Sequence, residues 1–433
     1  MTDTTKPAPD VITFGCRLNT AESERMLAHA TAAGLGDAII FNTCAVTTEA
    51  LSQARQAIRK AKRERPSARI IVTGCAAQIV PEQFAALDEV DHVVGNGEKL
   101  EAATWGALAA RGLERVTVSD IMLASSVGAL GEPAPRIRGQ RVRAHVPVQT
   151  GCNHRCTFCI IPFGRGPSRS VAPEAVVADI RQMVEAGTQE IVLTGVDMTS
   201  YGADLATPLS LGGLVQRILK DVPELPRLRL SSVDTIEIDD ALRDAFASHQ
   251  RLMPYLHLSL QHGADLILKR MKRRHLRTDA IRHCAELKRL RTDIVFGADL
   301  IAGFPTETEA HFQDSLDIVD ACGLTWLHVF PYSARPGTPA AKMPQVSSQV
   351  IKERAQRLRV KGEQARAQHL AALDGTVAEL LVEHGGRGRT PGFAEVMVDG
   401  LPGTLMTARL AHVTDAHGKA RLDGRAINLE TAA

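Results

Sequence analysis

The stretch 146-VPVQTGCNHRCTFCIIP-162 places three cysteines directly after a short strand-like run. Cys152, Cys156 and Cys159 follow the spacing C-x3-C-x2-C, so their thiolates must share one centre or repel one another as anions. A structural zinc site takes four ligands, and an electron-transfer iron–sulfur cluster usually has four cysteines. The trio therefore indicates a metal centre with one open position, and a zinc site completed by His154 is the alternative.

The chain around this motif alternates strand-like and helix-like segments. The helix-like segment 173-PEAVVADIRQMVEAG-187 has proline near its start and glycine after its end. The strand-like segments lie at residues 146–149, 190–194, 227–231, 255–260, 295–301 and 326–330. This alternation predicts an α/β domain at residues 145–372, built as an open, partial barrel of six βα units; a doubly wound sheet is the alternative.

A second trio of cysteines precedes this domain. Cys16, Cys44 and Cys75 each follow a short β-branched run: 11-VITF-14, 38-AIIF-41 and 70-IIV-72. Helix-like stretches between these runs predict a parallel α/β sheet at residues 10–130. Because the carboxyl ends of parallel strands meet at one edge, we expect the three thiols to converge there as metal ligands. Three buried, apolar cysteines are the alternative.

Two further segments complete the expected organisation. Residues 131–144 are rich in proline, glycine and arginine and predict a linker. Residues 375–433 combine glycine-rich turns with short strand-like runs such as FAEVMV and LMTARLAHV, which predicts a small all-β barrel. The remaining cysteines, Cys284 and Cys322, lie in helix-like stretches and are expected in the core.

Composition narrows the class of protein. The chain has 433 residues, a formal net charge of +2 and only 4% aromatic residues, so neither charge nor base stacking marks it as a nucleic-acid binder. Its N-terminus lacks the features of a signal peptide, and no apolar run approaches the roughly 20 residues that span a bilayer. We expect a cytoplasmic protein without a membrane partner, whose cysteines bind metal rather than form disulfides.

The spacing C-x3-C-x2-C at the end of the first strand of a βα barrel resembles the signature of the radical S-adenosylmethionine enzymes. With a second cysteine trio ahead of it and a small β-barrel behind it, the chain resembles the methylthiotransferase family over nearly its whole length. This resemblance implies a partial (β/α)6 radical S-adenosylmethionine barrel followed by a TRAM-like β-barrel. It also implies two 4Fe–4S clusters, each held by one trio. One would bind S-adenosylmethionine and generate a deoxyadenosyl radical, and the other would carry the sulfur.

The resemblance also implies which residues bind S-adenosylmethionine, at strand ends such as 191-IVLTGVD-197, 230-LSSVD-234 and 299-DLIAGFPTET-308. These residues are Phe158, Thr194, Gly195, Asp197, Ser232, Asp234, Gln261 and Phe304. No side chain is expected to act as an acid or base. Two positions depart from the family pattern: Thr150 stands where an acidic residue is common, and His262 stands where serine is usual.

The stretch 14-FGCRLNTAESE-24 resembles the form GC(K/R)(L/V)N-x-x-E of the enzymes that act on threonylcarbamoyladenosine. Enzymes for isopentenyladenosine more often read GCQMN, and those for a ribosomal protein GCPKN. The resemblance therefore implies methylthiolation of carbon 2 of threonylcarbamoyladenosine beside the anticodon of transfer RNA. The alternatives are isopentenyladenosine, a ribosomal protein, or a non-catalytic iron–sulfur protein that binds RNA or senses redox state.

Transfer RNA binding requires cationic surface. The richest run is 269-KRMKRRHLR-277, and residues 55–65 carry a second group, whereas the segment from Gly375 onward has six Lys/Arg against seven Asp/Glu. The expected RNA-binding residues are Arg165, Lys269, Arg270, Arg273, Arg274 and Arg335. We further expect a monomer that takes electrons from a donor such as flavodoxin or ferredoxin.

Overall fold

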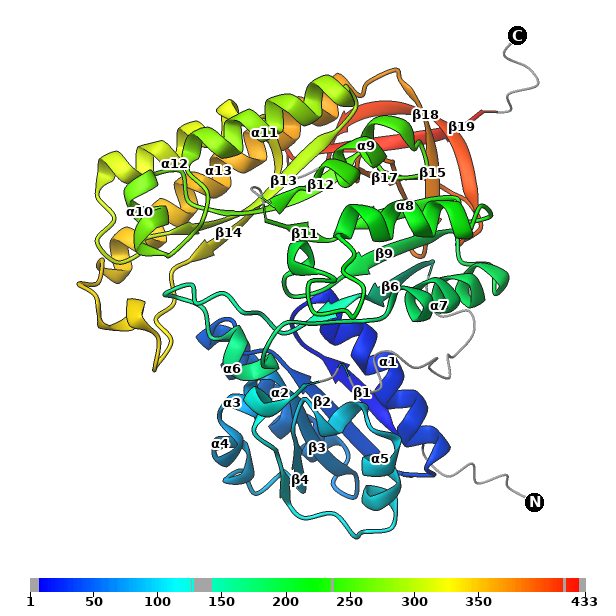
Figure 1. Cartoon of the computed structure of the whole chain (residues 1–433), viewed down its shortest axis with the longest axis vertical. Helices are drawn as coiled ribbons and strands as arrows, with labels where there is room; N and C mark the ends of the chain where they lie inside the picture. The colour runs from blue at the N-terminus through cyan, green and yellow to red at the C-terminus, as the bar shows by residue number, and fades with distance from the viewer. Residues whose placement is uncertain (1–7, 126, 128–141, 235–236, 416–417, 428–433) are drawn as a thin grey trace.

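The computed structural model describes residues 8–125, 127, 142–234, 237–415 and 418–427, so most of the predicted linker lies outside the described residues. Figure 1 shows the N-terminal sheet at one end of the molecule and the partial barrel at the other, with the C-terminal β-barrel packed beside the partial barrel. No helix in these ranges is long and apolar enough to cross a membrane.

The N-terminal domain is a parallel sheet with the strand order β1-β2-β3-β4-β5. Apolar clusters fill both faces of the sheet, one under α2 and α4 and the other under α1 and α5. The strands are β1 (Asp10–Thr13), β2 (Ala38–Thr43), β3 (Arg69–Gly74), β4 (His92–Val94) and β5 (Val116–Thr117). The helices are α1 (Arg17–Ala32), α2 (Thr48–Glu64), α3 (Cys75–Ile79), α4 (Pro81–Ala85) and α5 (Ala102–Ala109), with short turns η1 (Glu98–Leu100) and η2 (Ile121–Leu123).

The central domain is the expected open barrel, and its parallel strands follow one another in chain order. One sheet contains β6 (Arg143–Pro147), β9 (Glu190–Thr194) and β10 (Arg227–Leu230). The other contains β11 (Ser232–Val233), β12 (Tyr255–Gln261), β13 (Val295–Ala302) and β14 (Leu324–Pro331), and a parallel bridge between Leu228 and Leu252 joins the two. This arrangement excludes a doubly wound sheet.

Helices cover the outer face of this barrel. They are α7 (Pro173–Glu185), α8 (Leu211–Asp221), α9 (Asp240–Ser248), α10 (Asp265–Arg270), α11 (Arg277–Leu290), α12 (Glu309–Ala321) and α13 (Ser348–Ala372). Short elements at its edge are β7 (Gln149–Thr150), α6 (Ile161–Arg165), β8 (Arg169–Ser170), η4 (Met198–Ser200) and η6 (Pro339–Lys342). The strand predicted at residues 146–149 is therefore divided between β6 and β7. The first part pairs with β9, whereas β7 pairs antiparallel with β8. Cys284 and Cys322 lie in the core between strands and helices, as expected.

Alternation along the strands decides which side chains face the inside of the barrel. Leu256 and Leu258 of β12 pack into the core beneath the helices, as do Phe296 and Ala298 of β13. Because successive strand residues point to opposite faces, the intervening positions, among them His257, face the interior, here called the lumen.

The C-terminal domain is a closed β-barrel with the strand order β15-β16-β17-β19-β18. Its core gathers Leu380, Val396, Leu410 and Leu422, and Leu370 from the end of α13 packs into the same cluster. The strands are β15 (Val377–Glu383), β16 (Arg387–Arg389), β17 (Glu395–Met397), β18 (Leu405–Thr414) and β19 (Ala420–Ala426). Both strand-like runs that predicted this barrel lie in it.

Candidate metal centres

The central cysteine trio lies in a loop that leaves β7 at Gly151. Gly151 has φ +74°, and a Cβ added there would lie 1.8 Å from the carbonyl oxygen of Pro167, so the tight turn requires glycine. Backbone bonds hold the loop, because Cys152 N donates to Gly166 O at 3.1 Å and Cys159 N donates to Cys156 O at 3.1 Å. The first strand of the barrel therefore delivers the three thiols to the carboxyl edge of the sheet.

The thiols of this trio are desolvated and close enough to influence one another. Burial, with the neighbouring charge of Asp197, raises the pKa of Cys152 to about 12. Burial also raises the pKa of Cys159 to about 11, and Cys156 adds to the effect. Arg273 places Nη1 3.8 Å from the sulfur of Cys156. Buried thiols of this kind become thiolates when a metal replaces their protons, so the donor set fits a three-cysteine metal site.

The N-terminal trio occupies the equivalent edge of the parallel sheet. Cys16 follows β1, Cys44 follows β2 and Cys75 opens α3 after β3. A Cβ added to Gly15 would lie 2.9 Å from the sulfur of Cys44, so the turn that follows β1 touches the turn that follows β2. Burial raises the pKa of Cys44 to about 11, and the charges of Cys75 and Cys16 both act on it. These three cysteines therefore follow neighbouring strands at one edge of the sheet, although about 30 residues separate each from the next.

The two trios approach each other across the interface between the sheet and the barrel. A Cβ added to Gly164 in α6 would lie 3.2 Å from the Cβ of Cys75. Asn96 bridges the same contact, because its Nδ2 lies 3.7 Å from the sulfur of Cys75 and donates to Gly164 O. The charge of Cys75 also acts on Cys159 of the other trio. A ligand at the carboxyl edge of the barrel therefore has both sulfur trios as neighbours.

A buried ion cluster underlies the N-terminal trio. Glu22 on α1 accepts from Arg165 at 2.7 and 2.9 Å and from Lys99 at 2.7 Å. Burial acts to raise the pKa of Glu22, but the two cations overcome it and lower the pKa to about 2. The prediction that Arg165 contacts RNA is wrong, because this side chain is 3% exposed and committed to Glu22. Thr150, where the family commonly has an acid, touches the same guanidinium at 3.4 Å.

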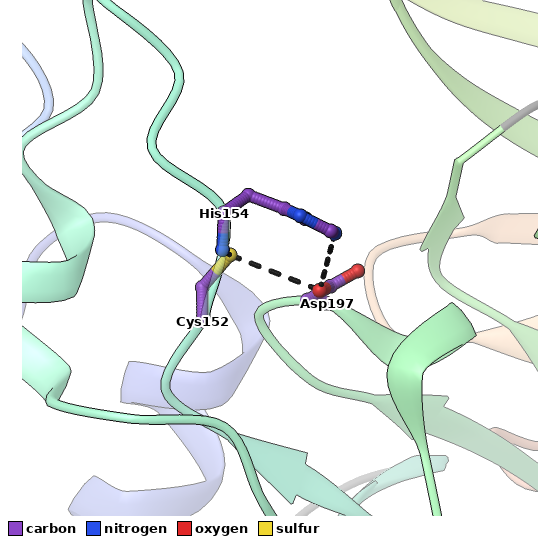
Figure 2. A group of neighbouring side chains, drawn as sticks. All are labelled: Cys152, His154 and Asp197. Atoms are coloured by element: carbon purple, nitrogen blue, oxygen red, sulfur yellow. Dashed lines mark hydrogen bonds and ion pairs between the residues drawn. The ribbon is translucent and has the colours of Figure 1, made fainter. Parts of the chain in front are cut away.

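His154 and Asp197 lie beside Cys152, as Figure 2 shows. Nε2 of His154 is 3.0 Å from Asp197 and 2.6 Å from Arg274, while Asp197 also accepts from Ser200 at 2.7 Å. Burial acts to raise the pKa of Asp197, but the hydrogen bonds from His154 and Ser200 hold it below its usual range. Ligand atoms of Cys152, His154 and Asp197 all lie within 4.8 Å of one another, a spacing that could hold a metal ion.

The residues expected to bind S-adenosylmethionine lie around the carboxyl edge of the barrel. Thr194 ends β9, and Gly195 is required because a Cβ there would lie 2.9 Å from Met198. Next along the edge, Ser232 and Asp234 lie in and just after β11. Oδ2 of Asp234 binds Arg273, and its buried Oδ1 lies 3.7 Å from Nδ1 of His275. A carboxylate at this edge suits a polar ligand that donates hydrogen bonds.

An apolar wall faces these polar groups. Phe158 meets Phe304 edge to face with ring centroids 6.4 Å apart, and Phe304 meets Tyr332 at 5.6 Å. Gln261 ends β12 at an irregular register with φ +72°, a conformation that re-aims its side chain. Such a wall suits the apolar face of an adenine ring.

His262, the second departure from the family pattern, is structural. The side chain is fully buried, its Nε2 lies 3.0 Å from Glu307, and its Nδ1 accepts from Ala264 N at 2.9 Å. Glu307 in turn binds Arg354 of α13 at 2.8 Å. His262 therefore ties the end of β12 to the loop before α12 and to α13.

The cations expected to bind RNA divide by burial. Lys269 and Arg274 are exposed, whereas Arg270 donates to Thr306 Oγ1 at 2.6 Å. The structure contradicts direct RNA contact by two others, because Arg273 is bound to Asp234 in the interior and Arg335 is only 7% exposed. Among these six cations, the exposed ones are thus confined to the turn around α10, and Arg59, Lys60 and Arg63 of the second cationic group are exposed on α2.

A polar cluster in the lumen was missed by the sequence reasoning. Nε2 of His257 lies 2.9 Å from Oδ1 of Asp299, Nδ1 of His328 lies 3.2 Å from the same oxygen, and the Tyr255 hydroxyl meets Nδ1 of His257 at 2.9 Å. Burial acts to raise the pKa of Asp299, but the two imidazoles lower it to about 2. The signal was present in 255-YLHLSLQ-261, where every second residue of a buried strand is polar.

Comparison with known proteins agrees with this architecture. The Radical SAM superfamily matches residues 146–319, and the Uncharacterized protein family UPF0004 matches residues 10–95. The radical S-adenosylmethionine methyltransferase TsrM from Kitasatospora setae superposes with a TM-score of 0.56 at 16% identity, over 77% of this chain and 74% of that chain. This likeness establishes the fold.

Curated relatives extend over most of the chain. The threonylcarbamoyladenosine tRNA methylthiotransferase MtaB of Rickettsia prowazekii is 45% identical over 90% of this chain and 91% of its own length. The Bacillus subtilis protein of that name is 34% identical over 86% and 84%. The tRNA-2-methylthio-N(6)-dimethylallyladenosine synthase of Erythrobacter litoralis is 33% identical over 90% and 91%. The chain therefore belongs to the methylthiotransferase family of radical S-adenosylmethionine enzymes.

Proposed function

We propose that this enzyme attaches a methylthio group to carbon 2 of threonylcarbamoyladenosine, next to the anticodon of transfer RNA. The observation that carries the proposal is the approach of two separate sulfur trios across one domain interface, linked through Gly164 and Cys75. The names of the Rickettsia and Bacillus relatives support threonylcarbamoyladenosine as the substrate. The Erythrobacter relative acts by name on dimethylallyladenosine, which keeps that nucleoside as the second candidate.

Each trio would hold one 4Fe–4S cluster with an open iron. When bound, the central cluster supplies the electron that cleaves S-adenosylmethionine, and the N-terminal cluster supplies the sulfur. We assign the central cluster to Cys152, Cys156 and Cys159, and the N-terminal cluster to Cys16, Cys44 and Cys75. An external one-electron donor, such as flavodoxin or ferredoxin, belongs to this proposal.

The protein's own residues would bind and orient the cofactor. The carboxylate of Asp234, which lies between Arg273 and His275, would accept a hydrogen bond from a hydroxyl or ammonium group of S-adenosylmethionine. Phe158, half-buried and backed by the fully buried Phe304, offers the apolar surface against which its adenine can pack and exclude water. Asp197, ionised and fixed by Ser200 and His154, keeps a negative charge beside Cys152 that suits an ammonium group.

RNA would approach at the exposed cations around α10. Lys269 and Arg274 are exposed, and Arg274 reaches His154 beside the central trio. Phosphates bound there would bring the anticodon loop to the carboxyl edge of the barrel. We expect substitution of Lys269 by glutamine to weaken RNA binding for every sequence and to lower its salt dependence.

A reconstitution experiment tests the proposal. The purified chain, loaded anaerobically with iron and sulfide, is incubated with S-adenosylmethionine, a reductant and anticodon stem-loops carrying either threonylcarbamoyladenosine or isopentenyladenosine. Mass spectrometry of the nucleosides should find the methylthio product of the first RNA. A product only from the second RNA would transfer the assignment to isopentenyladenosine, and no product from either would remove the function.

A further inference from the structure

The N-terminal end of the lumen is closed by a side chain of the C-terminal β-barrel. Phe393, in the loop between β16 and β17, stacks on Tyr255 with ring centroids 4.9 Å apart and an interplanar angle of 18°. Phe393 has φ +74°, so the loop is bent sharply where its ring enters the lumen. The side chains around this ring come from all three domains.

Four arginines place their guanidinium groups over the Phe393 ring. Three of them, Arg143, Arg229 and Arg389, lie 4.7–5.4 Å from the ring centroid and are paired with carboxylates. Arg143 and Arg389 bind Glu383 at 2.6 and 3.2 Å, and Arg229 binds Glu190 at 3.0 Å. These three guanidinium groups are therefore neutralised by the protein.

Arg17, the fourth, lies 5.9 Å from the ring and makes no hydrogen bond or ion pair with any residue that the structure describes. Tyr255, Arg229, Asp299 and Glu190 are the charged or titratable groups that act on it, so it extends from Cys16 into the lumen. Asp299 forms no ion pair with Arg17, and its Oδ1 is held by His257 and His328. A half-buried guanidinium without a hydrogen-bonding partner can bind an anionic ligand.

We propose that Arg17 binds the carboxylate of the threonyl group on the modified adenosine and thereby sets the enzyme's choice of nucleoside. This inference rests on the proposed function, because the threonylcarbamoyl group carries a carboxylate and the isopentenyl group does not. A guanidinium suits a carboxylate because its planar donors form two parallel bonds to it. Arg17 directly follows Cys16, so a nucleoside held by it lies beside the N-terminal trio.

A metal ion is the other occupant that the lumen residues could hold, since ligand atoms of His257, Asp299 and His328 lie within 4.8 Å of one another. The hydrogen bonds between both imidazoles and Asp299 and the positive charge of Arg17 favour an anion instead. Zinc analysis of the iron-loaded protein decides between them. A stoichiometric zinc that is lost in His328→Gln would overturn the proposal.

The decisive experiment is a double-substitution cycle that removes the charge of Arg17, the charge of the substrate's carboxylate, or both. Wild type and Arg17→Gln are compared on stem-loops carrying threonylcarbamoyladenosine as the free acid or as its methyl ester. We measure the Kd for each RNA by fluorescence anisotropy and the KM by product formation. Wild type should bind the acid about 10–100-fold more tightly than the ester, whereas Arg17→Gln should bind both about equally.

Matched variants separate this role from damage to the neighbouring cysteine. Arg143→Gln removes another guanidinium from the Phe393 ring and should keep the acid-to-ester ratio of wild type. Arg17→Lys keeps the charge without the planar fork and should restore part of that ratio. Iron content, and deoxyadenosine formation without RNA, report whether Arg17→Gln still carries its clusters.

Two results would overturn the inference: a wild-type enzyme that treats acid and ester alike, or an Arg17→Gln variant that keeps the wild-type ratio. Either result is distinguishable from failure of the proposed function. In that case the wild-type enzyme would methylthiolate neither the acid nor the ester form of the threonylcarbamoyl RNA. The anisotropy measurement needs no turnover, so it reaches a result even with a variant that has lost activity.

Discussion

Arg165 and Glu22 form a two-pronged ion pair, with N–O distances of 2.7 and 2.9 Å, across the interface between the barrel and the N-terminal sheet. Arg165 ends the short helix after the central trio, and Glu22 lies six residues beyond Cys16 on α1. Lys99 shares the carboxylate at 2.7 Å. The two cysteine trios are therefore held together by one buried, charged contact.

We predict that Glu22→Gln destabilises the protein by about 3–5 kcal/mol, because it leaves Arg165 and Lys99 buried without their anion. The measurement is the shift of the thermal midpoint of the whole chain. Glu64→Gln, which removes only an exposed pair with Lys60, is the matched control and should change the free energy of unfolding by less than about 1 kcal/mol. Equal shifts in the two variants would contradict the assigned importance of the interface pair.

The same pair predicts a pH dependence. Because the pKa of Glu22 is lowered to about 2 in the folded protein, its stabilisation is present above the unfolded pKa, near 4.5, and is lost as the pH falls toward 2. A lowering of this size corresponds to about 3 kcal/mol. The gap in denaturant midpoint between wild type and Glu22→Gln should be constant from pH 5 to 8 and should narrow between pH 4.5 and 2. A gap that widens on acidification would refute the assignment.

Removal of single ligands should separate the two metal centres. Cys152→Ala is expected to abolish formation of deoxyadenosine, whereas Cys44→Ala should leave it and abolish methylthio transfer. Each variant should lose about half of the roughly eight irons that two four-iron clusters supply. Cys284→Ala, in the apolar core, is the control and should keep its iron. Full methylthio transfer by Cys44→Ala would exclude the N-terminal trio from the reaction.

His262→Ser, which restores the usual residue of the family, should destabilise this protein by about 1–3 kcal/mol, because Glu307 loses a buried partner. The KM for S-adenosylmethionine should stay within about twofold of wild type, since both ring nitrogens of His262 are bonded, one to Glu307 and the other to the Ala264 backbone. His384→Ser, in an exposed turn, serves as the control for stability. A large rise in KM with an unchanged thermal midpoint would show that His262 acts on the cofactor instead.

Gly151→Ala should displace the loop of the central trio, because the new Cβ would meet Pro167 O at 1.8 Å. We expect less iron per chain and slower cleavage of S-adenosylmethionine. Gly187→Ala has a similar backbone strain, with φ +96°, but no atom within 4 Å of the new Cβ. Gly187→Ala should lower the free energy of unfolding by about 1 kcal/mol and keep its iron. Equal iron loss in both variants would point to general instability.

The places of the two cysteine trios in the fold could be predicted because Cys16, Cys44 and Cys75 each follow a recognisable strand and the central trio follows another, and strand ends of a parallel sheet share an edge. The open barrel could be predicted because strand-like and helix-like segments alternate regularly along the central part of the chain. Local pattern says nothing about partners from another domain. Arg165 looked like surface charge, and its partner Glu22 lies 143 residues upstream. The role of Arg17 depends in the same way on Phe393, which no local motif connects to it.

The buried contact between Glu22 and Arg165 also limits how the domains can move during catalysis. Separating the domains would leave Glu22 with Lys99 of its own domain but strip it of Arg165, and would leave the buried Arg165 without its anion, so large hinge opening is energetically suppressed. Sulfur transfer then cannot depend on a large movement of the N-terminal domain relative to the barrel. The distance between the two cysteine trios is therefore fixed by the folded structure. The target base of the RNA must enter the space between them.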